Sequence, residues 1–199
     1  MELSVTKEGI EFKKELNDLD KLVIDFVKVL DDSEVRYAIV SGYVAILFGR
    51  SRSSEDIDII IESIGKNKFG IVWEGLSKKF ECIITANRED AYNTYLSVSH
   101  PVRFSRKGKF IPNIEVKFPK VELDEWTLGN RKRVLLNGKI LYISPMELQI
   151  PFKLFLGSDK DIEDAKHLYN IFKNNINMNL LRQFLKKLNK EEIFNRYLK

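Results

Sequence analysis

Residues 37–59 read YAIVSGYVAILFGRSRSSEDIDI, and this stretch decides the fold of the chain. The four apolar residues that open it predict a buried strand, and Ser41 with Gly42 predicts a tight turn. A short apolar helix should begin near Tyr43, with Gly49 as the cap at its C-terminus. The stretch then continues through a basic segment into an acidic strand.

That strand carries two carboxylates, Asp56 and Asp58, two residues apart. Because side chains alternate between the two faces of a strand, both carboxylates point the same way, while Ile57 and Ile59 point into a core. At ~4 Å and an effective dielectric constant of about 20, the repulsion between them is on the order of 4 kcal/mol. A bound divalent cation would turn this repulsion into attraction, and Mg²⁺, which prefers oxygen ligands, is the expected partner.

Groups that favour phosphate surround the carboxylate pair. The helix that follows Ser41 and Gly42 directs free N–H groups and the positive end of its dipole toward the turn. Arg50 and Arg52 come after the helix and carry forked donors that suit phosphate oxygens. The implied ligand is a nucleoside triphosphate with its metal ion.

This layout resembles the nucleotidyltransferase superfamily, which includes DNA polymerase beta and the minimal nucleotidyltransferases. In that family an apolar strand, a Gly-Gly or Gly-Ser turn and a short spacer precede an Asp-x-Asp or Asp-x-Glu strand. Here the turn is Ser41-Gly42, the spacer is 43–55, and the strand begins Asp56-Ile57-Asp58. The ending Arg-x-Arg-Ser-x-Glu-Asp-Ile-Asp is most similar to the AbiEii/AbiGii-type toxin branch, which usually has Gly where Ser41 stands.

The resemblance implies a third carboxylate from a neighbouring strand, because two metal ions that bridge the attacking and leaving oxygens need more ligands than one pair supplies. The best candidate is Glu115. It lies in 111–118, where apolar residues alternate with charged ones and place Glu115 on the polar face of a half-buried strand. A solvated strand charge is the alternative for Glu115, and a polar strand edge is the alternative for Asp56 and Asp58.

A second block, 144–164, predicts two consecutive helices. Ser144 and Glu147 have the spacing of a capping box with Pro145 at the first helical position, and Gly157 should end that helix. Ser158 or Asp159 should then cap the next helix.

The same block extends the resemblance. The toxin-like branch has a Lys-Leu pair, a small-residue turn and a Lys/Arg-Asp-x-x-Asp motif here, matched by Lys153-Leu154, Gly157, Lys160-Asp161 and Asp164. The resemblance implies that Lys153 contacts phosphate and that Asp161 supports the site, with a smaller part for Asp164. A purely structural role is the alternative for Asp161, since the dipole favours an acidic residue in the first turn of any helix.

The expected fold is α/β (α+β), with a nucleotidyltransferase-type mixed β-sheet core, flanking helices and a helical C-terminal lobe. Helical spacing predicts helices near 16–30 and 64–79, and along most of the chain after 144. Strands are expected near 36–41, 56–62, 80–85, 112–118, 133–136 and 139–143, the last two joined by an Asn137-Gly138 hairpin turn. The composition changes at Ser144, so we expect a core with an N-terminal helix over 1–143 and the helical lobe over 144–199.

The composition agrees with a compact protein that handles polyanions. The 199 residues carry a formal net charge of +4. Basic clusters at 103–109, 131–133 and 186–187 would flank the cleft if the acceptor is RNA, and Tyr92 and Tyr95 are either packing residues or stacking partners for bases. Cys82 is the lone cysteine, no signal peptide is visible, and no apolar run approaches the ~20 residues that span a bilayer. We therefore expect the protein to lie in a reducing cytoplasm.

We therefore expect a Mg²⁺- or Mn²⁺-dependent enzyme that moves a nucleoside monophosphate from a triphosphate such as ATP to an acceptor hydroxyl. The resemblance implies that Asp56, Asp58 and Glu115 hold metal, that Glu115 draws the acceptor proton, and that the Ser41-Gly42 turn holds phosphate. It also implies tRNA, another RNA or a protein as acceptor, and an antitoxin partner for a toxin-like member.

Two alternatives stay open. The first is a catalytically silent member that binds nucleotide, RNA or a partner protein, and the position of Glu115 relative to Asp56 and Asp58 discriminates it from an enzyme. The second is a transferase for small molecules such as antibiotics, which would need a small acidic acceptor pocket.

Overall fold

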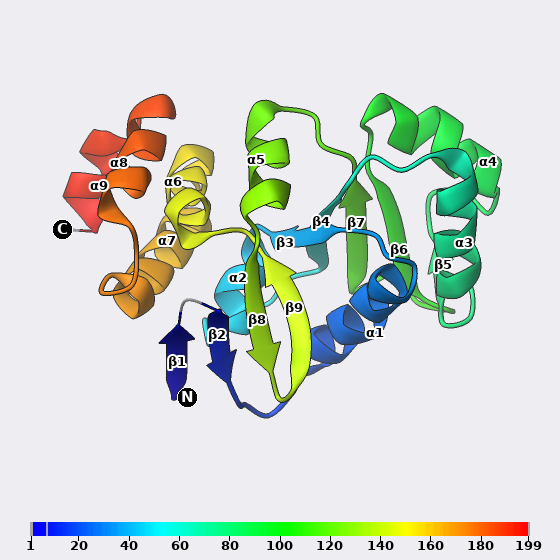
Figure 1. Cartoon of the computed structure of the whole chain (residues 1–199), viewed down its shortest axis with the longest axis horizontal. Coiled ribbons are helices and arrows are strands. Elements are labelled where there is room, and N and C mark those ends of the chain that lie inside the picture. Colours follow the sequence, from blue (N-terminus) through cyan, green and yellow to red (C-terminus); the bar gives the residue numbers. More distant parts are fainter. Residues whose placement is uncertain (1, 7, 199) are drawn as a thin grey trace.

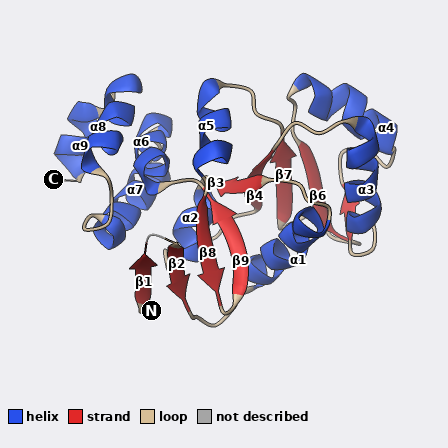
Figure 2. Cartoon of the chain, in the orientation of Figure 1, coloured by secondary structure: helices blue, strands red, loops and turns tan. Residues whose placement is uncertain are grey.

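The computed structural model describes residues 2–6 and 8–198. Within this part of the chain, the strands form one mixed sheet in the order β1-β2-β8-β9-β3-β4-β7-β6-β5, flanked by helices (Figures 1 and 2). The strands are β1 (Leu3–Thr6), β2 (Gly9–Phe12), β3 (Tyr37–Val40), β4 (Asp56–Ile61), β5 (Phe80–Cys82), β6 (Val102–Arg106), β7 (Asn113–Lys117), β8 (Lys132–Leu136) and β9 (Lys139–Ile143). The helical segments are α1 (Asp18–Asp32), α2 (Gly42–Leu47), α3 (Lys66–Leu76), α4 (Arg88–Asp90), the π-helical η1 (Ala91–Tyr95), the 3-10 turn η2 (Leu96–Val98), α5 (Glu122–Asn130), α6 (Met146–Leu156), α7 (Asp159–Phe172), α8 (Met178–Lys187) and α9 (Glu191–Tyr197). The expected mixed sheet, flanking helices and C-terminal helices are confirmed.

The sheet is wider than the sequence predicts. The β1–β2 hairpin, β6 and the helix α5 have no counterpart among the expected elements. β2 joins the sheet by parallel pairing with β8, and β6 joins by antiparallel pairing with β7. Such short segments carry little periodicity of their own, so pairing with strands distant in the sequence, more than local preference, makes them strands.

The motif segment forms the predicted strand, turn, helix and acidic strand, although the C-cap of α2 is Phe48 and Gly49 follows it at φ 93°. Ile57 and Ile59 of β4 are fully buried in the main core. On the opposite face, Ile60 packs with Ala38 against Leu128 of α5 in a small second core. Because side chains alternate along β4, its two aspartates lie on the α5 face, toward the other end of the strand.

The hairpin between β8 and β9 is confirmed in detail. Asn137 and Gly138 both have positive φ, 49° and 78°, which is the requirement of a type I′ turn. The Asn137 side chain also accepts a hydrogen bond from the N–H of Lys14 at 3.0 Å and donates one to its carbonyl oxygen at 2.8 Å. The turn therefore also anchors the segment between β2 and α1.

The C-terminal helices begin and end near the predicted residues, but the predicted capping box is wrong. α6 has Pro145 as its N-cap and no side-chain cap, so Pro145 precedes the first helical residue. Glu147 instead accepts a hydrogen bond at 3.1 Å from the N–H of Asn177, before α8. A bond to a neighbouring helix thus replaces the local one. Gly157 ends α6 at φ 75°, and Ser158 caps α7, as expected.

Helices α6–α9 gather at one end of the molecule, and α3 and α4 lie at the other (Figure 1). α7 reaches the core through Phe172, whose ring lies 4.8 Å from that of Phe48 after α2. In the described ranges 2–6 and 8–198, none of the helices combines the length and apolar character needed to cross a bilayer.

Two glycine substitutions should change stability in opposite directions. A Cβ at Gly129 in α5, or at Gly138 in the β8–β9 turn, would meet nothing within 4 Å, so backbone conformation alone decides the sign. Gly129→Ala should raise the free energy of unfolding by about 0.5–1 kcal/mol through helix preference. Gly138→Ala should lower it by about 1–2 kcal/mol, because an L residue is strained at positive φ. Urea denaturation measures both, and changes of equal sign would contradict this reading.

Candidate active site

Strand register places the three predicted metal ligands on one face of two neighbouring strands. β4 and β7 are neighbours in the sheet (Figure 1). They run parallel, with Asp58 paired with Glu115 and Asp56 paired with Asn113. Paired residues on adjacent strands project to the same face, so the three carboxylates share it. β6 adds Arg103, which is paired with Glu115 from the other side. All three carboxylate side chains are partly buried.

The carboxylates are electrostatically coupled. The pKa of Asp58 is raised from its ordinary 3.8 to about 6, mainly by burial and then by the negative charges of Glu115 and Asp56. A hydrogen bond from the Ser41 side chain and the positive charge of Lys117 act in the opposite sense. The face therefore holds negative charge at a cost that a cation would relieve.

The turn between β3 and α2 is strained and is held from two sides. Ser41 has φ 61° and ψ −136°, a conformation that glycine adopts readily and other residues rarely do. The N–H of Ser41 donates to Oε1 of Gln149 on α6 at 3.3 Å, and Nε2 of Gln149 donates to the carbonyl oxygen of Ser41 at 2.7 Å. Its side chain bonds to Asp58. The turn predicted to hold phosphate is thus fixed by α6 and by β4.

Five charged side chains form a cluster beside this turn. We call it the Asp164 cluster: Arg50, Arg52, Lys153, Asp161 and Asp164. Asp164 is fully buried and accepts two hydrogen bonds at 3.0 Å, from Nε and Nη2 of Arg52. Nζ of Lys153 lies 3.0 Å from Asp164 and 2.7 Å from Asp161, and Nε of Arg50 lies 3.8 Å from Asp164. The cluster holds α6 and α7 against the loop after α2.

The cluster reaches the turn through Arg52. A Cβ added at Gly42 would collide with Nη2 of Arg52, so the guanidinium occupies space that only glycine leaves free. Burial acts to raise the pKa of Asp161, but hydrogen bonds from Lys153 and Ser158 outweigh it and hold that pKa below its ordinary value. The cluster combines three cationic side chains with two carboxylates, so its formal charge has one positive charge in excess.

The predicted nucleotide-binding residues are therefore brought to one place, although not all are free to bind. Ser41, Gly42 and Arg52 adjoin one another. Lys153 is only 2 % exposed, and its ammonium is held by two carboxylates. Arg50 is the most accessible of the cluster's cations, with 29 % of its side chain exposed. Sequence reasoning gave Asp164 the smallest role, yet Asp164 is the common partner of all three cations.

The acidic face offers oxygen donors and negative charge, which suit a hard cation. Its carboxylate oxygens do not converge on one point. In the described part of the chain, no three His, Cys, Asp or Glu side chains are grouped closely enough to hold a metal ion. Glu115 instead accepts two hydrogen bonds from Arg103, at 3.0 and 2.7 Å, both on Oε2. Asn113, paired with Asp56, has a buried Oδ1 with no hydrogen-bond partner among the described residues. This unpaired oxygen acceptor adds a group of the kind that a hard cation binds.

Sequence reasoning missed Gln149, Arg103 and Asn113. Arg103 had a weak signal, because it belongs to a basic cluster that was expected to flank the cleft. Gln149 had none, since its partner Ser41 lies 108 residues away.

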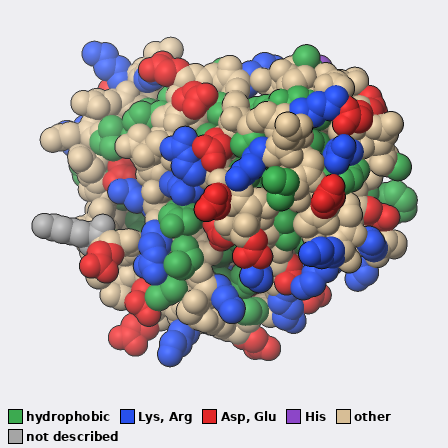
Figure 3. Space-filling view, turned by 45° about the vertical axis from the view of Figure 1, so that its right-hand side comes forward, with side chains coloured by type: hydrophobic (Ala, Val, Ile, Leu, Met, Phe, Trp, Pro, Cys, Tyr) green, Lys and Arg blue, Asp and Glu red, His purple; other side chains and the backbone are tan. Residues whose placement is uncertain are grey.

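The other basic and aromatic candidates have structural partners. Arg106 pairs with Asp25, and the guanidinium of Arg131 stacks 4.0 Å above the ring of Tyr142. The Tyr92 hydroxyl donates a hydrogen bond to a backbone carbonyl, as in a packing residue. On the face that Figure 3 shows, basic and acidic side chains are interspersed. These contacts do not single out a surface for RNA.

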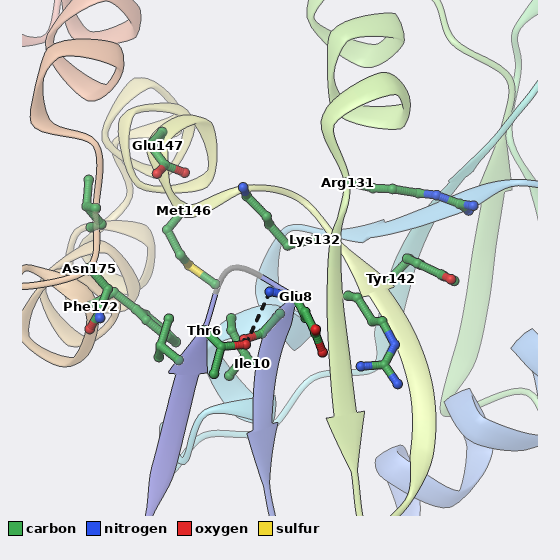
Figure 4. A pocket seen from close by; sticks show the side chains of 14 residues that line it. Thr6, Glu8, Ile10, Arg131, Lys132, Tyr142, Met146, Glu147, Phe172 and Asn175 are labelled. Atoms are coloured by element: carbon green, nitrogen blue, oxygen red, sulfur yellow. Dashed lines mark hydrogen bonds between the residues drawn. The ribbon is translucent and has the colours of Figure 1, made fainter.

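A separate cavity of about 300 Å³ lies between the β1–β2 hairpin, β8 and the start of α6 (Figure 4). Its lining includes Arg131, Lys132, Tyr142 and Glu147. None of the described residues that line it belongs to the acidic face, to the Ser41 turn or to the Asp164 cluster. The candidate site is therefore the sheet face and not this cavity.

No family model and no curated protein matches the sequence. Among solved structures, the chain is similar to an antigenic nucleotidyltransferase-like protein from Paracoccidioides brasiliensis, with a TM-score of 0.54 and 17% identity over 88% of this chain and 90% of that chain. It is also similar to the antibiotic-resistance factor ANT(2'')-Ia, with a TM-score of 0.54 and 10% identity over 90% of this chain and 97% of that chain. The same factor in complex with adenylyl-2''-tobramycin gives a TM-score of 0.54 and 11% identity, over 83% of this chain and 95% of that chain. At these identities the likeness shows the fold, which is nucleotidyltransferase-like, while the AbiEii/AbiGii branch stays a prediction.

Neutralising Asp58 should stabilise the metal-free protein in a pH-dependent way. Its pKa rises from 3.8 to about 6 on folding, so folding disfavours the ionised form. The penalty is absent below about pH 4, grows between the two pKa values and is complete above about pH 6. Asp58→Asn should therefore raise the free energy of unfolding by on the order of 2–3 kcal/mol near pH 8, and by almost nothing near pH 4.

Denaturation in EDTA at both pH values measures this difference. Glu62, which directly follows β4, is the matched control. Burial acts to raise its pKa, but hydrogen bonds and the charge of Arg36 outweigh this and lower it, so Glu62→Gln should lower stability near pH 8. A loss near pH 8 for Asp58→Asn, or a gain that does not depend on pH, would contradict the charge coupling.

Removing the charge of Asp164 should destabilise the folded protein. Asp164→Asn leaves Arg52 and Lys153 partly unpaired in a buried setting, so the free energy of unfolding should fall by about 3 kcal/mol or more. Asp159→Asn, an exposed change in the first turn of the same helix, should cost about 0.5 kcal/mol or less. Guanidinium denaturation compares the two, and similar small losses would show that Asp164 is dispensable.

Proposed function

We propose that this chain is a metal-dependent nucleotidyltransferase, which transfers a nucleoside monophosphate from a triphosphate such as ATP to an acceptor hydroxyl and releases pyrophosphate. The observation that carries the proposal is the register of Asp56, Asp58 and Glu115 beside the strained Ser41-Gly42 turn. The shared fold supports it, since one protein of similar structure, ANT(2'')-Ia, was solved in complex with adenylyl-2''-tobramycin. A carboxylate face next to a basic cluster is the charge pattern that a metal-bound triphosphate requires.

Each group of residues would have its own role in binding the metal-bound triphosphate. Asp56, Asp58 and Glu115 would hold Mg²⁺ or Mn²⁺, which when bound neutralises charge on the phosphate oxygens. The Ser41-Gly42 turn would bind the terminal phosphates, assisted by Arg50, Arg52 or Lys153. Lys153 is buried against Asp161 and Asp164, so it would act through the positive charge that it adds to the cluster, with Asp161 supporting it. In this proposal the triphosphate would lie between negative charge on the sheet and excess positive charge in the Asp164 cluster.

The chemical step needs one proton acceptor. Glu115 would take the proton of the acceptor hydroxyl while the hydroxyl oxygen bonds to the α-phosphorus. The bond from that phosphorus to the bridging oxygen breaks, and pyrophosphate leaves with the electron pair. Both hydrogen bonds from Arg103 end on Oε2, and Oε1 takes none from the described residues. Oε1 is therefore the oxygen that we propose for the metal ion or the proton.

The acceptor and partners follow from the sequence and stay proposals. A polyanionic acceptor such as tRNA or another RNA is supported by Arg103, whose side chain is 45 % exposed beside Glu115, and by the half-exposed Lys117. We propose further that 1–143 and 144–199 act as two lobes around this substrate. A toxin-like member would also bind an antitoxin protein.

A catalytically silent, nucleotide-binding member is the second candidate, and the Arg103–Glu115 pair favours it. A guanidinium that stays on Glu115 would keep the third ligand from the metal. Transfer to a small molecule is the third candidate, because the relative of known structure carries an adenylylated antibiotic.

A transfer assay tests these candidates. Wild-type protein with Mg²⁺ or Mn²⁺ should label RNA or protein acceptors from a triphosphate labelled at the α-phosphate. Asp58→Asn should lower the rate by roughly 10³-fold or more, since the carboxylate acts in the reaction itself. Asp32→Asn, an exposed carboxylate on α1, is the matched control and should transfer normally.

The outcomes separate the alternatives. Equal transfer by Asp58→Asn and wild type would remove the catalytic claim. Binding of ATP without transfer to any acceptor would favour the silent member, and transfer only to aminoglycosides would favour the small-molecule enzyme.

A further inference from the structure

Gln149 is a buried amide whose two hydrogen bonds both go to one residue. It lies on α6 and is 3 % exposed. Nε2 donates to the carbonyl oxygen of Ser41 at 2.7 Å, and Oε1 accepts from the N–H of Ser41 at 3.3 Å. A buried amide needs partners, and here a residue 108 positions away in the chain supplies both.

These two bonds restrain both backbone angles of Ser41. The N–H belongs to the peptide plane shared with Val40, and the carbonyl oxygen belongs to the plane shared with Gly42. Each plane is rigid, so the angle between them is set only by φ and ψ at Ser41. In the trans peptide the N–H of Gly42 points opposite to the carbonyl of Ser41, and hence away from Gln149.

Ser41 needs such a restraint. Its φ of 61° and ψ of −136° are disfavoured for any residue with a side chain, and such conformations persist only where the surroundings impose them. The same residue bonds to Asp58 through its side chain. The conformation of Ser41 therefore sets how the turn meets the acidic face.

We propose that Gln149 is a positioning residue that holds Ser41 in this conformation for nucleotide binding, an inference that rests on the function proposed above. Gln149 acts through Ser41 and contacts no reacting atom. Lys153, one turn further along α6, is bound to Asp161 and Asp164. A shift of α6 against the sheet would therefore change the turn and the charge cluster together.

A double-mutant cycle on stability tests the restraint without any substrate. Gln149→Met keeps the size of the side chain and removes both hydrogen bonds, and should raise the unfolding equilibrium constant about tenfold. Both bonds go to backbone atoms that glycine keeps, but only with serine does their loss also release strain, so in a Ser41→Gly background the same change should cost at least about threefold more. Equal costs in the two backgrounds would overturn the proposal.

Glu147 supplies the matched control on the same helix. It is also a buried polar side chain bonded to a backbone N–H, but that N–H belongs to Asn177, and Glu147 lines the separate cavity of Figure 4. Glu147→Met should therefore cost the same with Ser41 or Gly at position 41. A control that also depended on position 41 would mean that the coupling is general, and would overturn the specific role of Gln149.

Kinetics test the positioning role. In active protein, Gln149→Met should raise KM for the metal-bound triphosphate about tenfold, with kcat changed less than about threefold, and Ser41→Gly should restore part of the loss. Glu147→Met should leave KM unchanged. Equal KM values for Gln149→Met and wild type would overturn the positioning role alone. Absence of transfer by the wild type would end the proposed function, and the stability cycle would still decide whether Gln149 holds Ser41.

Discussion

Repulsion between carboxylates on adjacent strands is the constraint on which the site depends, and the hydrophobic core imposes it. Ile57 and Ile59 of β4 and Ile114 of β7 are fully buried on one face. A slip of one residue would turn these side chains to the other face and bury the carboxylates, so the core fixes the register. That register sets Asp58 directly beside Glu115. Burial of the isoleucines thus stabilises the sheet and also holds the carboxylates of Asp58 and Glu115 side by side.

The C-terminal helices complete this site and are more than a cover for the sheet. α6 brings Gln149 to the turn and Lys153 to the charge cluster, while α7 brings the buried Asp164 to Arg52. Negative charge on the sheet and the excess positive charge of the Asp164 cluster, which comes from Arg50 and Arg52 on the loop after α2, lie beside the same turn. A metal-bound triphosphate has the complementary pattern, with cationic and anionic parts in one ligand. α6 and α7 are tied to Ser41 and Arg52 by polar bonds in addition to apolar packing, as the proposed binding of such a ligand requires.

The local parts of this arrangement could be predicted from the sequence, and the long-range parts could not. The stretch 37–59 specifies its strand, turn, helix and acidic strand because each signal lies within a few residues, and alternation alone places Glu115 on a polar face. Asp164 is the opposite case. Nothing near it shows that its carboxylate is fully buried against an arginine 112 residues away. The capping box at Glu147 failed for the same reason, because Asn177 offers the competing bond.

A crystal structure with Mn²⁺ and a non-hydrolysable triphosphate analogue measures the central claim most directly, because Mn²⁺ is located by its anomalous scattering. The predicted result is a Mn²⁺ peak among the oxygens of Asp56, Asp58 and Glu115, with the terminal phosphates at the Ser41-Gly42 turn. A metal and triphosphate bound elsewhere, with Glu115 still held by Arg103, would contradict it.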